Sequence, residues 1–268
     1  MSRKLALAAT AALTVMVGGP AWAQSATAPA DPVPAAAAQP ADAATRAAYD
    51  RADALSRSIF WAREQQINPM DPIAGAKTAE ALRELGQYDK AAEAAEATLL
   101  VQPNNVEAML EAGRAHIARG QAFYGIARLE KARDLTPGDW RPLSLLGVAY
   151  QQVKRPDDAR AAWNAGLALS PDNPNILANA AMALATSGDP VGAEGLLRRA
   201  AAQPGASLQI RQNLALVLGL QGKIAEAETI IRRDLPPDQA DRNLEWLRRQ
   251  TGGAVHGAPR TWDSLQGG

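Results

Sequence analysis

The chain has 268 residues, 28 basic and 28 acidic side chains, two histidines and no cysteine. Without cysteine it forms no disulfide or thiolate metal site, and the balanced charge leaves no basic excess to neutralise nucleic-acid phosphates. Aromatic residues are 4% of the chain and hydrophobic residues 47%, many of them alanine, which favours close-packed helices over sheets. We therefore expect no nucleic-acid partner, no cofactor or metal, and no enzymatic activity.

The N-terminal segment 1–23 has the pattern of an export signal. Arg3 and Lys4 precede an apolar run over 5–19, and Ala21-Trp22-Ala23 offers small residues for cleavage before Gln24. The run of about 15 residues is shorter than the ~20 that a spanning helix needs, and no cysteine follows for lipid attachment. The sequence predicts a signal peptide over 1–23 cleaved after Ala23, a periplasmic location and no direct membrane anchor.

Two segments separate this signal from the body of the chain. Residues 24–44 are rich in alanine and proline and carry one large apolar side chain, Val33, so they are predicted to be a flexible linker. Residues 45–71 are predicted to form an N-terminal helix or a degenerate half repeat, because Trp61 and Pro69 share the phase of the units that follow.

The body of the chain is periodic, and its period is about 34 residues, within the range typical of repeat proteins. Four series of residues keep this period: Pro69, Pro103, Pro137 and Pro171; Gly86, Gly120, Gly188 and Gly222, with Lys154 in the missing place; Ala91, Gly125, Ala159, Ala193 and Ala227; and Ala79, Gly113, Gly147, Ala181 and Ala215. The glycines suit a left-handed residue at the end of a first helix, and the prolines end a second helix. Small residues in the last two series let paired helices approach closely.

These residues resemble the tetratricopeptide repeat (TPR), a helix–turn–helix unit of about 34 residues. The third unit carries Leu146-Gly147, Tyr150, Ala159, Trp163 and Pro171 where the pattern has them. The resemblance predicts an all-α fold, a right-handed TPR solenoid with five units. Pro237 at a helix start, with Ala240, Leu244 and Leu247 on one side, predicts a capping helix over 237–250, and the glycine-rich residues 251–268, which have no helical period, are predicted to be a disordered tail. The five units are predicted at 72–105, 106–139, 140–173, 174–207 and 208–241.

The resemblance implies that a groove lined by the first helix of each unit binds a protein or peptide. Its residues in the first two units are charged, as at Lys77, Glu80, Arg83, Glu111 and Arg114, which is typical of a solvated face. In the last two units they are amide-rich and partly apolar. The candidate peptide-binding residues are therefore Asn175, Asn179, Met182, Gln209, Gln212, Asn213 and Leu216.

Asn179 and Asn213 lie one full repeat apart, and both occupy the sixth position of their units. A side-chain amide both donates and accepts, so stacked asparagines can hold the backbone of an extended peptide. The alternative is two polar residues that face water, since Lys77, Glu111 and Leu145 break the series. The two histidines indicate no site: His116 takes a packing position, and His256 lies in the tail.

The fifth unit and the cap, RQNLALVLGLQGKIAEAETIIRRDLPPDQADRNLEWLRR over 211–249, resemble the TPR protein of tight-adherence (Flp) pilus assembly. That resemblance implies an exported assembly factor whose partner is a pilus secretin or another envelope assembly subunit. Members of that family anchored by lipid use a cysteine, which this chain lacks. The alternatives are a general periplasmic adaptor for cell-wall synthesis or cytochrome maturation, and an enzyme accessory domain, for which the sequence offers no clustered catalytic set.

Overall fold

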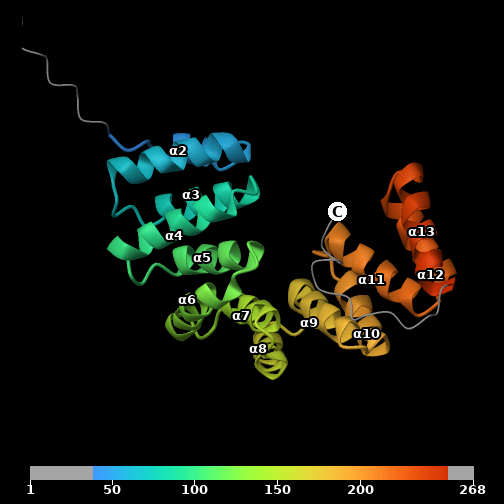
Figure 1. The fold of residues 1–268 in the computed structure, drawn as a ribbon. Helices are drawn as coiled ribbons and strands as arrows, with labels where there is room; N and C mark the ends of the chain where they lie inside the picture. Colours follow the sequence, from blue (N-terminus) through green and yellow to red (C-terminus); the bar gives the residue numbers. More distant parts are fainter. Residues whose placement is uncertain (1–38, 253–268) are drawn as a thin grey trace, which may run out of the picture. The chain divides into compact units, whose positions relative to one another are not determined.

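The computed structural model describes residues 39–252, and these residues form thirteen α-helices and no strand, which confirms the all-α fold (Figure 1). The predicted signal peptide, most of the linker and the tail beyond Gly252 lie outside the described residues. The helices are α1 Ala43–Tyr49, α2 Ala54–Ile67, α3 Ala74–Glu84, α4 Tyr88–Val101, α5 Val106–Ala118, α6 Ala122–Leu135, α7 Trp140–Gln152, α8 Pro156–Leu169, α9 Pro174–Thr186, α10 Pro190–Ala201, α11 Leu208–Leu220, α12 Ile224–Asp234 and α13 Pro237–Gly252.

Each repeat unit holds one pair of helices, from α3 with α4 to α11 with α12. The first helix of each unit also contacts the first helix of the next, in the series α3, α5, α7, α9 and α11. The cap α13 contacts both α11 and α12, so it takes the place that the first helix of a sixth unit would have. We call α3, α5, α7, α9, α11 and α13 the first-helix layer.

The turn inside every unit has a residue in the left-handed conformation at the same place. Gly86, Gly120, Gly188 and Gly222 have φ between 71° and 94°, and Lys154 has φ 60° at the corresponding place in the third unit. A backbone hydrogen bond closes each turn, as where the Arg155 amide donates to the Tyr150 carbonyl at 2.8 Å. This is a Schellman-type helix end, and glycine adopts it at lower cost than lysine because glycine has no Cβ.

A further series of residues supplies side-chain oxygens to the start of the first helix of each unit; four of them are the N-cap residues of α5, α7, α9 and α11, and Asp71 lies two residues before the N-cap of α3. Side-chain oxygens of these residues accept hydrogen bonds from the first free amides of α3, α5, α7, α9 and α11. The capping residues are Asp71, Asn105, Asp139, Asn173 and Ser207. They recur once per unit at a constant spacing, so their common period fixes where each unit begins.

Small residues let the paired helices pack closely. A Cβ added to Gly125 of α6 would lie 3.1 Å from the Cα of Gly113 of α5, and one added to Gly147 of α7 would overlap the Trp163 indole of α8. Most of the buried apolar side chains belong to one large cluster over the first three units, which also includes Ile176 of α9, or to a second cluster over the last two units and the cap. Leu167 of α8 packs against both clusters, so the apolar interior continues from the third unit into the fourth.

The N-terminal segment divides into two helices. Asp53 interrupts it because its carboxylate accepts a hydrogen bond from the Ser56 amide at 3.0 Å and so caps the start of α2. The side chain of Trp61 in α2 is fully buried, and Tyr49 of α1 stacks on Phe60 with ring centroids 4.0 Å apart. α1 therefore covers one side of α2.

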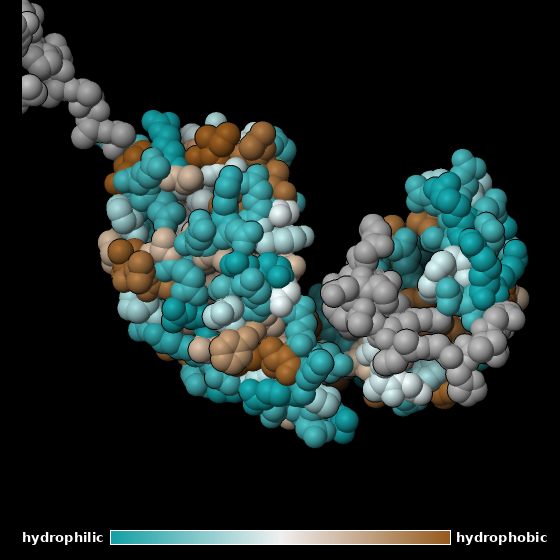
Figure 2. Space-filling model, viewed as in Figure 1, coloured by the Kyte–Doolittle hydropathy of each residue, from teal (hydrophilic) through white to brown (hydrophobic). Residues whose placement is uncertain are grey.

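The face of the described residues that Figure 2 shows is mainly hydrophilic, with separate hydrophobic patches. Leu55 and Ile59 of α2 and Phe123 and Tyr124 of α6 are each more than half exposed. No helix within 39–252 combines the length and the apolar character needed to cross a membrane.

Candidate protein-binding pocket

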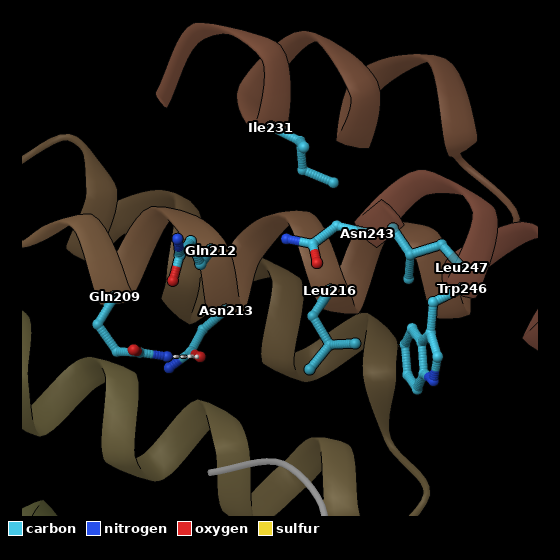
Figure 3. A pocket seen from close by; sticks show the side chains of 8 residues that line it. All are labelled: Gln209, Gln212, Asn213, Leu216, Ile231, Asn243, Trp246 and Leu247. Carbon is cyan, nitrogen blue, oxygen red and sulfur yellow. Dashed lines mark hydrogen bonds between the residues drawn. The ribbon is translucent and has the colours of Figure 1, made fainter. Parts of the chain in front are cut away.

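A pocket of about 220 Å³ lies where α11, α12 and α13 meet (Figure 3). Residues Leu208–Leu220 form a helix with Ile210, Leu214 and Leu218 on the buried side, and this leaves the neighbouring polar face free to line the pocket. α13 closes the other side. The lining residues are Gln209, Gln212, Asn213, Leu216, Ile231, Asn243, Trp246 and Leu247.

The lining combines uncharged amide groups with an apolar wall. Four of the eight side chains are amides, and the Gln209 Nε2 donates a hydrogen bond to the Asn213 Oδ1 at 3.0 Å. Ile231 and Leu247 are almost fully buried, whereas the Trp246 side chain is 37% exposed. An amide donates and accepts at once, so this surface suits a peptide backbone beside a large apolar side chain.

The structure brings together four of the residues that the sequence proposed. Gln209, Gln212, Asn213 and Leu216 all line the pocket. The other four lining residues lie on α12 and α13 and were not predicted from the sequence: Ile231, Asn243, Trp246 and Leu247. The one local signal in the sequence was Trp246 itself, because aromatic residues are only 4% of the chain. In the structure this residue is 37% exposed.

The other three proposed residues lie on α9 and do not line this pocket. Asn175 is exposed and Asn179 is half-buried, so both reach the surface of the helix that precedes α11 in the first-helix layer. Met182 is 5% exposed and belongs to the core cluster that includes Leu214 and Leu218. Met182 therefore packs mainly in the core, and its part in the groove stays a prediction, as do those of Asn175 and Asn179.

A second, charged pocket of about 390 Å³ lies on α3, α5 and α7. Its ionic groups are largely paired with one another. Arg83 and Arg114 both contact the buried carboxylate of Glu111, the first at 2.8 Å, and Arg141 contacts Glu107 at 2.8 Å. A partner that bound here would have to compete with ion pairs that already exist.

His116 is a packing residue. Its side chain is buried, and burial lowers the pKa of the imidazole. Its Nε2 lies 3.8 Å from the Glu96 carboxylate, and its ring lies 5.9 Å from that of Tyr124. Over residues 39–252, histidine and acidic side chains form no group of three or more arranged to hold a metal ion.

The helix pairs stack on one another through their first helices, and each turn within a pair contains a left-handed residue. This arrangement defines an α-solenoid of helix–turn–helix repeats. Two family models described as tetratricopeptide repeat match the chain, one over residues 77–139 and 144–207 and the other over 211–233. Together they cover more than half of it. The chain belongs to the TPR proteins, which are protein-interaction scaffolds.

Solved structures agree with this fold. A thermophilic TPR protein of Thermus thermophilus is 22% identical, with a TM-score of 0.56 over 65% of this chain and 94% of its own. The Cut9–Hcn1 hetero-tetramer of the APC/C contains a chain that is 16% identical, with a TM-score of 0.60 over 79% of this chain and 45% of its own. At these identities the likeness shows the fold alone.

Among curated proteins, the chain is similar to cellulose synthase operon protein C of Xanthomonas axonopodis pv. citri (strain 306). The two are 35% identical over 131 residues, which is 45% of this chain. The chain matches only 9% of the length of that relative.

Proposed function

We propose that this protein is an exported, non-catalytic TPR adaptor of Flp (tight-adherence) pilus assembly, and that it holds a segment of a partner protein at the α11–α13 pocket. One observation carries the proposal. All the pocket residues except Gln209 fall within 211–249, the stretch that resembles the TPR protein of that assembly system. The part of the chain with the most specific resemblance therefore also forms the uncharged pocket.

The chemistry of the pocket defines the segment that it binds. Amide groups at Gln212, Asn213 and Asn243 are suited to backbone N–H and C=O groups, and the wall formed by Leu216 and Leu247 is suited to a large apolar side chain. The adjacent surface of α9, with Asn179, extends this amide character by one unit. We infer an extended, uncharged segment of an envelope assembly protein such as a secretin.

The test is to crosslink a tagged full-length chain in intact cells and to identify the captured proteins by mass spectrometry. The proposal predicts a secretin or other pilus-assembly subunits, and a lower pilus count after deletion of the gene. An unchanged pilus count would exclude the pilus system. Export is tested separately by the mass of the mature chain in a periplasmic fraction, which should begin at Gln24.

A second candidate is an adaptor for another envelope complex. The match to cellulose synthase operon protein C favours it, because that relative is named for a polysaccharide synthesis operon and covers 45% of this chain. Cell-wall synthesis and cytochrome maturation remain alternatives of the same kind. Capture of polysaccharide-synthesis or cell-wall enzymes, in place of pilus subunits, would select this candidate while leaving the pocket assignment intact.

A further inference from the structure

The helices at the two ends of the array have different outer faces. A repeat array needs terminal helices with polar outer faces to stay soluble. At the C-terminal end, α13 meets this requirement with exposed charged residues such as Asp241, Arg242 and Glu245. At the N-terminal end, the outer face of α2 is apolar: Leu55 is 56% exposed, and Ile59, one turn later, is 66% exposed. Figure 2 shows hydrophobic residues gathered over this end of the array, where Figure 1 places α2.

The other sides of α2 are already covered. Trp61, which is fully buried, packs against α3, and Phe60 stacks on a ring of α1. Gln65 donates a hydrogen bond to a side chain of α4 at 3.0 Å. The opposite side of the helix carries apolar residues at i, i+4 and i+7, which form one stripe along α2. We call these residues the α2 stripe: Leu55, Ile59 and Ala62.

The α2 stripe is complementary in shape to a second copy of itself. We propose that two copies of this chain form a dimer in which their α2 helices pack antiparallel, with Ile59 at the two-fold axis. Leu55, one turn before Ile59, then lies opposite Ala62 of the second copy, which is about one turn after it. The two-fold axis repeats this contact, so a large side chain meets a small one at both places, as close packing requires.

Charge favours the same arrangement. Arg63 is exposed and forms no hydrogen bond or ion pair with another residue of 39–252. The Asp53 carboxylate is held at Ser56 by hydrogen bonds of 3.0 and 2.7 Å. Ser56 and Arg63 are about two turns apart, so they lie on the same flank of the α2 stripe. Antiparallel packing brings Arg63 of each copy to Asp53 of the other, whereas parallel packing would leave both guanidinium groups far from either carboxylate.

The dimer is expected to be weak and reversible. One stripe of one helix offers less surface than the ~800 Å² per partner of a standard stable interface, so the copies should exchange between monomer and dimer. The contact uses none of the residues that line the α11–α13 pocket. Two linked pockets would bind a partner with repeated segments more tightly than one pocket does. The inference does not rest on the proposed function, because it holds whatever the pocket binds.

The chain has no cysteine, so single cysteines test the arrangement in the full-length protein. Ile59→Cys places two thiols at the two-fold axis of the dimer. Leu100→Cys is the matched control, because Leu100 is also apolar, is 85% exposed and lies on another helix, α4. Under mild oxidation, Ile59→Cys is expected to form disulfide-linked dimers about tenfold faster than Leu100→Cys, because the dimer raises the effective thiol concentration. Equal rates would overturn the proposal.

Charge exchange provides a second test in the protein without cysteine. Arg63→Glu and Asp53→Lys should each abolish the dimer in sedimentation measurements, because each change places like charges across the interface twice. An equimolar mixture of the two variants should restore it, since both contacts then join opposite charges. Melting curves show whether each variant is folded, and if one is not, the cysteine rates decide. A mixture of folded variants that stays monomeric, or a dimer that persists in Ile59→Asp, would overturn the proposal.

Discussion

The first-helix layer has two chemically different regions. In the first three units it presents charged side chains whose ion pairs are already formed, such as Arg83 with Glu111 and Arg141 with Glu107. In the fifth unit and the cap it presents amides and an apolar wall around one pocket. The same backbone repeat thus supports two kinds of surface. In one region the charged side chains form ion pairs with one another, and in the other the side chains are uncharged and suited to binding a partner.

This difference shows how a repeat protein separates stability from recognition. The residues that define the repeat, the capping series and the left-handed turns, recur in both regions. The pocket depends on α13, which continues the first-helix layer in space but begins 29 residues after α11 begins, short of the 34-residue period. We therefore expect specific binding at the C-terminal end of the array. Within the array, we expect the helices of successive units to pack in the same way.

The largest effect is expected in the interior of the third unit. Gly147→Ala places a Cβ against the rigid indole of Trp163, which is 4% exposed and donates a hydrogen bond to the Ser144 carbonyl at 3.2 Å. Overpacking of this kind should reduce the free energy of unfolding by about 2–3 kcal/mol, as measured by urea denaturation.

Gly195→Ala is the matched control, because a Cβ at Gly195 of α10 meets no atom within 4 Å. That change should stabilise the chain by about 0.5–1 kcal/mol through helix propensity. If both substitutions had the same effect, close packing between paired helices would not be what limits residue size at Gly147.

The next effect concerns an acidic group in the fourth unit. Glu194 is buried and contacts Lys223 at 2.6 Å and Arg198 at 2.7 Å. The hydrogen bond from Lys223, with that from Arg198, lowers the pKa of the Glu194 carboxyl from 4.5 to about 2. Its stabilising contribution is present above pH 4.5 and is lost as the pH falls towards 2, because the unfolded chain binds the proton first.

Glu194→Gln should therefore be less stable than the wild type at pH 6, and the difference should shrink as the pH falls from 5 to 2. Urea midpoints at several pH values measure this. The exposed Glu93→Gln on α4 serves as the control and should track the wild type. A difference that stays constant with pH would show that Glu194 acts through packing alone.

A smaller loss is expected where the cap meets the fifth unit. In Gly219→Ala, the new Cβ would lie 2.6 Å from a terminal methyl of Leu247, which can rotate away at modest cost. We expect a destabilisation of about 1 kcal/mol, which is less than at Gly147 because a leucine adapts more easily than an indole. Since Leu247 lines the pocket, partner capture should fall as well. Unchanged capture would show that α13 contributes to stability and not to binding.

The smallest effect concerns the turn of the third unit. Lys154 has φ 60°, in the region that glycine occupies in the other four units. Lys154→Gly should raise the free energy of unfolding by about 0.5–1 kcal/mol, because relief of the left-handed strain exceeds the entropy that glycine loses on folding. Thermal melting is compared for the two variants. Lys154→Gly should raise the melting temperature, and Gly120→Ala, which puts a Cβ on a left-handed residue, should lower it. A loss in both variants would indicate that Lys154 makes a contact of its own.

The fold could be predicted from sequence because each unit repeats the same local constraints. The glycine series indicated where left-handed turns occur, including the place of Lys154, and the proline series indicated where second helices end. The division of the N-terminal segment into α1 and α2 was missed, although Asp53 with Ser56 is a local capping signal.

The candidate pocket could be predicted only in part. Gln212, Asn213 and Leu216 follow from the repeat phase, because each unit position has a fixed orientation on the first helix. Asn243 and Trp246 could not be placed in this way, because α13 begins at Pro237, earlier than the 34-residue period predicts, so unit positions do not carry over to it. The unit position of Met182 predicts the groove, but repeat phase alone does not show that this side chain is largely buried in the core cluster.

The most direct test of the account compares the two regions of the first-helix layer in living cells. A photo-crosslinking amino acid is placed at residue 213 in the amide pocket or at residue 80 in the charged pocket of the full-length chain. The account predicts adducts with an envelope assembly protein from position 213 and a background level from position 80. Adducts from position 80 alone, or equal adducts from both positions, would contradict the assignment of recognition to the α11–α13 pocket.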